Sequence, residues 1–473
     1  MFYISVARHI SDGAGFVGYD GDFFVLEPPL YPVILAGIKK MLFIDPLLSA
    51  GYLNAILSGL VIYFSGLLLS MNLKSFQLII LGTISVLASF VFIQIFLNAL
   101  SEPLFIFFVL LYLYYFNIYR VRGAVSSLLL FSTATALACL TRYVGVILIL
   151  TGSISILVWG TNTLKSKFSH ILIFMIMAIL PTGLWIFRNY FLTGTLVGQR
   201  AGSSYTLFEN IIFLFDTVLR WYLPVQLNGT QLFFIIIISA VIFTGIVFVN
   251  SWKKGDRKLN QIAPVIIFVL FYSGIIVVSS TTTAYDRIGD RLMSPVFVPL
   301  LIIVFLFLDI ILNKLSKYFH HWPVSDLFII GIILWLEYPV LETIREGNDY
   351  VQKSGWGYGG KAWKDNSVIN YLIKHKNLKT GNSFYSNAPE AVYILANKGT
   401  NWSPFKTFYN SPQPVNLELS LNSISKLENK DYLIWFNNID RNCLYTIEEL
   451  RKRTNMSKVV QLKDGEIYTI AGK

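Results

Sequence analysis

The sequence predicts an all-α polytopic membrane domain of about ten transmembrane helices, followed by a small C-terminal α/β domain. Apolar residues make up 55% of the 473 residues and charged residues only 14%, whereas soluble proteins carry about 25% charge. Long apolar stretches recur along residues 1–342, and the composition becomes polar after residue 342. We therefore expect a membrane domain over 1–342 and a separate α/β domain over 343–473.

Ten stretches are long and apolar enough to cross a bilayer core, which takes about 20 apolar residues in a helix. They cover residues 47–70, 76–97, 103–119, 124–140, 143–159, 170–187, 231–250, 262–280, 295–313 and 325–341. The stretches 124–140 and 143–159 have almost no loop between them. That pair could therefore also form one kinked or re-entrant unit.

The loops between the stretches fall into two sets that differ in charge. One set carries most of the cations: Lys74, Arg120, Arg122, Lys165, Lys167, Lys253, Lys254, Arg257, Lys258, Lys314 and Lys317. The positive-inside rule places this set in the cytoplasm. Residues 1–46, 188–230, 281–294 and 343–473 then lie outside. We expect a multi-pass plasma-membrane protein with an extracytoplasmic C-terminal domain, and the Lys-, Ile- and Asn-rich composition suggests a bacterial source.

An external N-terminus needs a route across the membrane, and residues 1–46 are too polar to be a signal peptide. We favour a first transmembrane helix upstream of Met1 over unaided translocation of this tail. Within the tail, 3–10 and 30–43 carry apolar residues at helical spacing. They predict two short helices on the membrane surface, in the first external loop.

The polar C-terminal part alternates between helical and extended patterns. Helices are expected at 367–376, 389–397 and 446–453, and strands at 383–386, 431–436, 458–462 and 466–470. Asp464-Gly465 is a hairpin signal before the last strand. This alternation predicts a small α/β domain, which we expect to cover or shape an external site.

Several classes of function are disfavoured by composition. Two cysteines, Cys139 and Cys443, lie in very different surroundings, and the five histidines show no metal-ligand spacing. The net charge of +11 is not gathered into the basic face that nucleic-acid binding requires. We therefore expect no metal, no cofactor and no nucleic-acid partner. The positive charge is better explained by interaction with the bilayer and by the binding of anionic ligands.

Ionisable residues at the predicted external boundary are the candidates for chemistry, because such groups are costly near a membrane. Glu102 begins a helix in SEPLF, and the arginines Arg142, Arg188, Arg287 and Arg291 lie on the same side. Arginine suits bidentate contact with phosphate. The plainer alternatives are a first-turn helix-dipole partner for Glu102 and, for the arginines, pairing with nearby aspartates or lipid headgroups.

The first external loop adds three carboxylates, Asp20, Asp22 and Glu27, in GYDGDFFVLEPPLYP. The simpler interpretation of this segment is an acidic loop exposed to solvent. The Asp-x-Asp pair alone is weak evidence for a metal site.

An ordered set of motifs resembles the GT-C class of membrane glycosyltransferases. FYISVARHISDGAGF and LEPPLYPVILAGI, which contain Tyr3 and Tyr31, resemble the family's first external loop. SEPLF, LTRYVG, WIFRNYFLTG and RLMSP follow in order over most of residues 1–342. The set is most similar to the branch of protein O-mannosyltransferases, aminoarabinose transferases and lipopolysaccharide sugar transferases.

The resemblance implies a mechanism. A polyprenyl-phosphate-linked sugar is the donor, and an extracytoplasmic glycan, lipid or protein is the acceptor. A carboxylate in the first external loop acts as general base on the acceptor hydroxyl, and lipid phosphate leaves with inversion at the sugar. Glu102 matches the family's second acidic position, Arg188 and Arg291 match its external arginines, and Arg142 is a weaker match. Tyr3 and Tyr31 are acceptor-contacting or loop residues.

One departure from the family pattern concerns the general base. In the family, the catalytic Asp lies about three residues before the tyrosine that Tyr3 matches. In this sequence, the position of that Asp falls just upstream of Met1. Asp20, Asp22 or Glu27 could substitute only with a different loop register.

Two rival functions stay open from the sequence. One is a transporter or flippase of lipid-linked sugars, although no internal repeat is evident. The other is a non-catalytic protein that binds lipid-linked sugar, which the absent Asp favours.

Overall fold

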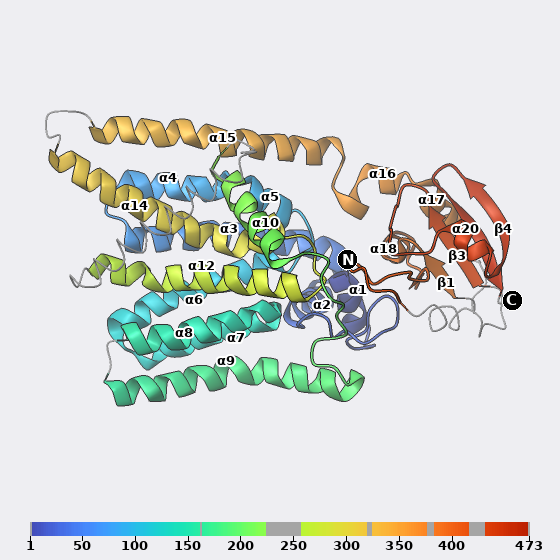
Figure 1. The fold of residues 1–473 in the computed structure, drawn as a ribbon, viewed down its shortest axis with the longest axis horizontal. Coiled ribbons are helices and arrows are strands. Elements are labelled where there is room, and N and C mark those ends of the chain that lie inside the picture. The colour runs from blue at the N-terminus through green and yellow to red at the C-terminus, as the bar shows by residue number, and fades with distance from the viewer. Residues whose placement is uncertain are drawn as a thin grey trace.

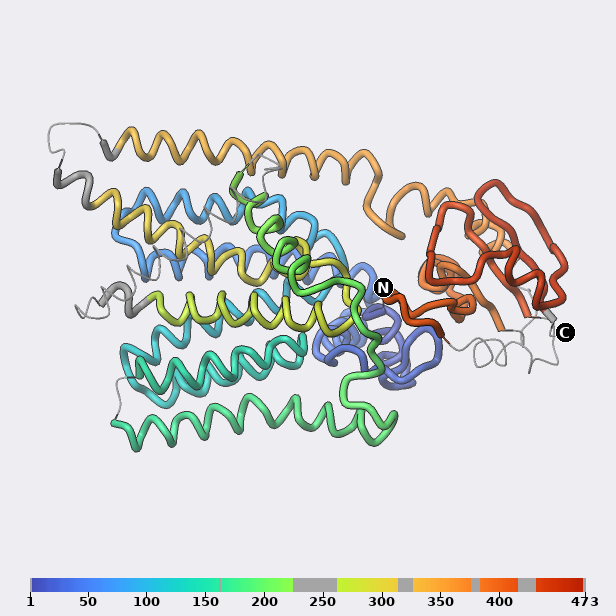
Figure 2. The backbone as a smooth tube through the Cα atoms, viewed as in Figure 1, coloured from blue at the N-terminus to red at the C-terminus, as the bar shows by residue number. Residues whose placement is uncertain are grey.

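The structure is a computed structural model that describes residues 2–160, 163–223, 257–318, 324–375, 383–415 and 431–471. It has three parts: a bundle of long apolar helices, a pair of short helices at one end of the bundle, and a small α/β domain beyond that pair (Figure 1). Figure 2 shows that the path of the chain leaves the bundle for the α/β domain at the end of one long helix.

The bundle contains the apolar helices that the sequence predicts within the described residues. They are α3 (Pro46–Asn72), α4 (Phe76–Leu87), α5 (Phe90–Phe96), α6 (Glu102–Arg122), α7 (Val125–Thr141), α8 (Val146–Trp159), α9 (Leu164–Thr193), α12 (Arg257–Thr282), α14 (Phe297–Tyr318) and α15 (Val324–Gln352). The helix α10 (Leu207–Arg220) crosses the bundle obliquely (Figure 1). The single turn α13 (Asp290–Met293) and the 3-10 turn η2 (Ser294–Val296) lead into α14.

The described residues do not reach the predicted count of ten spans. Six helices are long and apolar enough to cross a membrane, or seven if α4 and α5 count as one span bent by 44°. At the α4–α5 break, Thr343 of α15 donates a hydrogen bond of 2.7 Å to the carbonyl oxygen of Ala88. The predicted span 231–250 lies outside the described residues.

The remaining shortfall comes from the predicted pair 124–140 and 143–159. The structure has two antiparallel helices here, α7 and α8, which are apolar but shorter than a full span. Between them Arg142 is extended (φ −149°, ψ 136°), and the 3-10 turn η1 (Tyr143–Gly145) starts the return. Gly145 permits this reversal, because a Cβ there would lie 2.8 Å from the backbone of Cys139.

The core of the bundle is centred on α6. This helix is apolar on all sides and buries residues along its whole length, including Phe105, Tyr112 and Phe116, as expected for a helix enclosed by others. It packs against α3 and α7. The peripheral helix α15 instead exposes large apolar side chains such as Ile330, Ile333 and Leu334, which suits contact with lipid. The protein is therefore a membrane protein of several apolar helices.

The N-terminal segment forms the two predicted short helices, α1 (Phe2–Ser11) and α2 (Leu30–Leu42). α1 is more buried than a surface helix with one apolar stripe, because even Ser5 is fully buried. It lies between the bundle and the α/β domain (Figure 1). Arg8 fixes its position with two hydrogen bonds of 3.0 Å to Asp45, the residue that caps α3.

The C-terminal domain has one five-stranded sheet with the order β2-β1-β3-β5-β4. Its strands are β1 (Phe384–Ser386), β2 (Asn401–Trp402), β3 (Asp431–Phe436), β4 (Asn455–Leu462) and β5 (Gly465–Ala471). β1 is parallel to β2 and β3, and β5 is antiparallel to β3 and β4. The helices are α16 (Lys361–Lys364), α17 (Ser367–Lys374), α18 (Pro389–Ala396) and α20 (Ile447–Arg451), with a 3-10 turn η3 (Gly357–Gly359).

The predicted elements of this domain lie within a few residues of their observed bounds, and the expected Asp464-Gly465 turn joins β4 to β5. α17 and α18 pack against the β3 and β5 residues Ile434, Phe436 and Ile467. The boundary expected at residue 342 falls inside α15, which continues to Gln352.

Candidate active site

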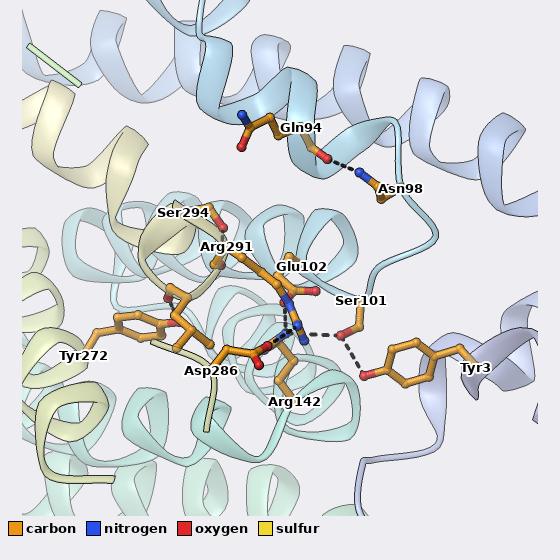
Figure 3. A network of polar contacts seen from close by, with 11 residues as sticks. Tyr3, Gln94, Asn98, Ser101, Glu102, Arg142, Tyr272, Asp286, Arg291 and Ser294 are labelled. Atoms are coloured by element: carbon orange, nitrogen blue, oxygen red, sulfur yellow. Dashed lines mark hydrogen bonds and ion pairs between the residues drawn. The ribbon is translucent and has the colours of Figure 1, made fainter. Parts of the chain in front are cut away.

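The site is centred on Glu102, the first residue of α6. Its carboxylate is almost fully buried, with 1% of the residue exposed. Oε1 accepts a hydrogen bond of 2.7 Å from Nε of Arg291 and also pairs with the Arg142 guanidinium (Figure 3). Oε2 is buried and accepts no hydrogen bond from the described residues. A buried carboxylate needs such charged partners, because isolation from water would otherwise penalise its ionised form.

Arg142 reaches Glu102 because of the break between α7 and α8. Its extended backbone turns the side chain toward the start of α6, where it also approaches Oγ of Ser101 at 3.4 Å. Burial lowers the pKa of Arg142, but the Glu102 carboxylate together with Tyr272, Tyr3 and Glu27 raises the pKa overall. The guanidinium is therefore a fixed cation with only 12% of its side chain exposed.

Arg291 comes from α13 and links Glu102 to a second carboxylate. Its NH1 lies 3.0 Å from Oδ2 of Asp286, in the loop before α13. Two contacts hold α13 on the bundle: the Trp221 indole donates a hydrogen bond of 2.7 Å to Asp290, and the Tyr272 hydroxyl donates one of 2.9 Å to the Leu292 carbonyl.

The short helix α1 supplies Tyr3, whose hydroxyl lies 3.0 Å from Oγ of Ser101 (Figure 3). Burial, and then the charge of Glu27, raise the pKa of Tyr3 well above its usual value, so its hydroxyl stays protonated. Tyr31 packs edge-on against Tyr3 with 5.2 Å between ring centroids. The Tyr31 hydroxyl is buried without a hydrogen-bond partner within the described ranges.

A cavity of about 110 Å³ opens beside this cluster. Its lining is Glu27, Arg142, Tyr143, Val144, Arg200, Ile276, Ser279, Ser280, Tyr285, Asp286, Arg291 and Leu292. Three arginines thus face a space that also contains two carboxylates and two serine hydroxyls. Arginine forks bind phosphate oxygens in a bidentate manner, so the cavity has the chemistry of a phosphate site with a carboxylate beside it.

Glu27 is the loop carboxylate that the structure brings into this cavity. Burial raises its pKa, although the nearby Arg142 and Arg200 charges oppose that effect. Arg200 fixes the adjacent backbone by donating a hydrogen bond of 2.7 Å to the Leu26 carbonyl.

Sequence reasoning missed Arg200, Tyr285 and Ser101. Arg200 lies in the polar loop after α9, and its guanidinium stacks over the Tyr285 ring with 5.3 Å to the centroid. The available signal was that Arg200 is a further arginine in a loop predicted to lie outside, where topology does not require positive charge.

Arg188 lies outside the cavity lining. It stacks over the Trp185 ring, with 4.4 Å to the centroid, and donates a hydrogen bond of 3.2 Å to the Phe24 carbonyl. The amide of Asn189 and the hydroxyl of Tyr143 hold the carbonyl of Val25, the next residue. These contacts place the segment that leads to Glu27.

The remaining candidates also lie outside the cavity. Arg287 is exposed and stacks over the Phe213 ring, with 4.0 Å to the centroid. Asp20 accepts a hydrogen bond of 3.2 Å from the backbone of Asp22 in a turn. The neighbouring Tyr19 packs against Tyr393 of the C-terminal domain. Among the described residues no group of three or more His, Cys, Asp or Glu side chains could hold a metal ion.

No protein-family model matches the sequence, and no curated protein matches it. Solved structures do match. ArnT from Cupriavidus metallidurans bound to undecaprenyl phosphate superimposes with a TM-score of 0.61 at 12% identity, covering 99% of this chain and 92% of that chain. The Archaeoglobus fulgidus oligosaccharyltransferase in complex with Zn and sulfate gives 0.54 at 10% identity, over 99% and 68%. The same organism's AglB with an inhibitory peptide and a dolichol-phosphate gives 0.52 at 11% identity, over 92% and 65%.

These matched proteins are GT-C glycosyltransferases. The chain has the GT-C fold. The resemblance drawn from the ordered motifs is thereby confirmed at the level of fold. Three of those motifs, SEPLF, LTRYVG and RLMSP, supply Glu102, Arg142 and Arg291, which the GT-C fold brings into one ion-paired cluster.

Proposed function

We propose that this GT-C protein is a membrane glycosyltransferase. It moves a sugar from a polyprenyl-phosphate donor to an extracytoplasmic acceptor, with inversion at the anomeric carbon. The observation that carries the proposal is the convergence of Arg142, Arg200 and Arg291 on one cavity that also contains Glu27. The structures with the same fold that contain undecaprenyl phosphate or dolichol-phosphate support the class of donor.

The three arginines have the role of binding the donor phosphate and stabilising the charge that develops on it. Glu102 holds two of these arginines in position, since both Arg142 and Arg291 pair with its Oε1. A preorganised cation of this kind acts on the transition state without reorganising during the reaction. Glu102 is thus a positioning residue, and the arginines contact the phosphate.

Glu27 has the role of general base, because its carboxylate lines the same cavity. It does not take part in the ion pairs that Glu102 forms with Arg142 and Arg291. It takes the proton of the acceptor hydroxyl while that oxygen forms a bond to the anomeric carbon. The bond from that carbon to the phosphate oxygen breaks, and its electron pair leaves with the lipid phosphate. The phosphate gains one negative charge as Glu27 loses one, so the total charge of the cavity stays constant.

The first experiment measures donor-site binding with undecaprenyl phosphate itself as the probe, by native mass spectrometry of the full-length protein in detergent. Arg291→Ala should weaken binding at least tenfold. Arg287→Ala is the matched control, because its guanidinium stacks on Phe213 away from the cavity, and it should bind like the wild type. Equal binding by the wild type and Arg291→Ala would overturn the site.

Release of lipid phosphate from a polyprenyl-phosphate sugar separates the proposal from its rivals. A transferase frees lipid phosphate only in the presence of acceptor-containing membranes, and Glu27→Gln abolishes this release. A non-catalytic binding protein or a flippase leaves the donor covalently intact, and that result would exclude the transferase.

A further inference from the structure

A large groove lies where the C-terminal domain meets the membrane domain. Its volume is about 1060 Å³, and residues of both parts line it: Ser204 and Asp286 from the loops of the bundle, and Trp402, Tyr409 and Arg441 among those from the C-terminal domain. The groove is therefore far larger than the 110 Å³ cavity of the proposed donor site.

Asp286 belongs to both spaces. Its Oδ2 lies 3.0 Å from NH1 of Arg291 in the donor site, and its Oδ1 accepts a hydrogen bond of 3.2 Å from the side-chain amide of Asn410 in the groove. Ser204 adds a hydrogen bond of 3.0 Å to the carbonyl of Asn410. Asp286 therefore lies at the boundary that the groove shares with the donor cavity.

The exposed groups of the groove combine aromatic faces with amides. Phe408 and Tyr409 leave 40% and 56% of their surface exposed. The side chains of Asn438 and Asn442 are also exposed. An amide offers two donors and one acceptor, and a flat aromatic ring offers an apolar face. A sugar ring presents the matching pattern, with C–H groups on its faces and hydroxyls around its edge.

The charge of the groove selects among possible acceptors. Its acidic groups are Asp286, Glu390 and Asp440, and its one cation within the described lining is Arg441. Arg441 is already engaged, since it stacks over Trp402 with 4.4 Å to the ring centroid and lies 3.5 Å from Glu390. Glu390 is therefore paired with Arg441, and Asp286 is paired with Arg291. Asp440 is the remaining carboxylate of the described lining, so the groove is weakly acidic, disfavours phosphate and carboxylate groups and accepts neutral hydroxyls.

We propose that this groove binds an uncharged saccharide as the acceptor and delivers one of its hydroxyls to Glu27 past Asp286. The inference rests on the proposed glycosyl transfer and adds to it the class of acceptor. Tyr409 and Phe408 stack against the sugar faces, and Asn438 and Asn442 bond its hydroxyls.

The test is direct binding of free oligosaccharides to the full-length protein in detergent, by saturation-transfer NMR. The probes are cellotetraose, chitotetraose and mannotetraose, with tetragalacturonate as the anionic counterpart. We expect saturable binding of at least one neutral tetrasaccharide and none of tetragalacturonate. The double variant Tyr409→Ala/Asn442→Ala should weaken binding at least tenfold.

The control is Asn437→Ala, because Asn437 is an exposed asparagine beside Asn438 that does not line the groove; it should bind like the wild type. Failure of every neutral probe to bind, preference for the anionic probe, or binding that the double variant leaves unchanged would each overturn the inference. The assay needs no donor, so it stands apart from the undecaprenyl phosphate test. Saccharide binding without donor binding would overturn the proposed transfer and leave the groove as a saccharide-binding site without an acceptor role. Donor binding without saccharide binding would overturn only this acceptor.

Discussion

Nε of Arg291 lies 2.7 Å from Oε1 of Glu102, although 189 positions of sequence separate the two residues. The same oxygen pairs with Arg142, which comes from a third part of the chain. One buried carboxylate therefore holds together the start of α6, the α7–α8 break and the turn before α14. The position of two cavity arginines depends on this single group.

Glu102→Gln should lower transfer by about 10²- to 10³-fold, the loss typical of removing one preorganised electrostatic contact. The amide keeps the shape of the side chain but no longer neutralises two guanidinium groups, so these repel each other and move apart. Release of lipid phosphate measures the effect. Glu342→Gln, which removes the carboxylate of an exposed pair on α15, is the control and should keep full activity. An active Glu102→Gln protein would remove Glu102 from the site.

Gly145→Ala should destabilise the protein by about 1–3 kcal/mol, the usual cost of overpacking. The new Cβ would lie 2.8 Å from the Cys139 backbone, and backbone cannot yield as a flexible side chain can. Unfolding by SDS titration measures the free energy. Gly183→Ala in α9 is the matched control, since nothing lies within 4 Å of its added Cβ; it should gain about 0.5–1 kcal/mol. Equal effects of the two substitutions would contradict the tight α7–α8 turn.

Transfer should fall at acidic pH through the protonation of Glu27. Burial raises its pKa above the ordinary value of a glutamate, and a general base acts only when ionised, so the acidic limb should have its midpoint above that ordinary value. A pH–rate profile checks this. An acidic limb at or below the ordinary glutamate pKa would contradict the assignment.

The contribution of Glu27 to the stability of the protein should instead become more favourable as the pH falls. A carboxyl group whose folded pKa is raised favours folding less as it ionises, so its contribution is lost as pH rises. Glu27→Gln should therefore match or exceed the melting temperature of the wild type at pH 7.5, while transfer is abolished. The difference in melting temperature should vanish below the unfolded pKa of about 4.3. A large loss of stability at pH 7.5 would show that Glu27 is structural.

Arg188→Ala should lower transfer without weakening undecaprenyl phosphate binding. Its guanidinium holds the Phe24 carbonyl and the Trp185 ring, so its loss displaces the segment that carries Glu27, and misplacement by about 1 Å can cost about 10²-fold in rate. Comparison of the two assays decides between positioning and phosphate contact. Weakened lipid binding would instead support the phosphate role expected from the sequence. Arg188→Lys, which keeps a donor, should recover part of the rate.

Residues that break a strong local pattern could be predicted from the sequence. Glu102, Arg142 and Arg291 are ionisable groups at the ends of apolar stretches, where charge is costly without a purpose, and all three belong to the observed cluster. The apolar stretches themselves gave most of the helices for the same reason. Arg200 was missed because its loop has no apolar pattern against which an arginine stands out.

Features that depend on distant contacts could not be predicted. At the α4–α5 break the Ala88 carbonyl accepts a hydrogen bond from Thr343, 255 positions later in the sequence, and nothing in the sequence around Ala88 indicates this partner. The groove exists because the C-terminal domain packs against loops of the bundle, with Asn410 held by Asp286 and Ser204. Which loop carboxylate enters the cavity depended on the fold of the loop, which brings in Glu27 and leaves Asp20 beside the C-terminal domain.

The orientation of the protein in the membrane is the last expectation to test. Lys74 belongs to the cation-rich loops and lies between α3 and α4. The connection from α3 to α4 is at the end of the bundle away from the C-terminal sheet (Figure 1), whereas Ser457 is exposed on β4 of that sheet. In a Cys443→Ser background, Ser457→Cys should react with an impermeant maleimide in intact cells. Lys74→Cys should react only after permeabilisation, because cation-rich loops stay in the cytoplasm. The reverse labelling would place the groove and the donor cavity inside the cell, where an extracytoplasmic acceptor could not reach them.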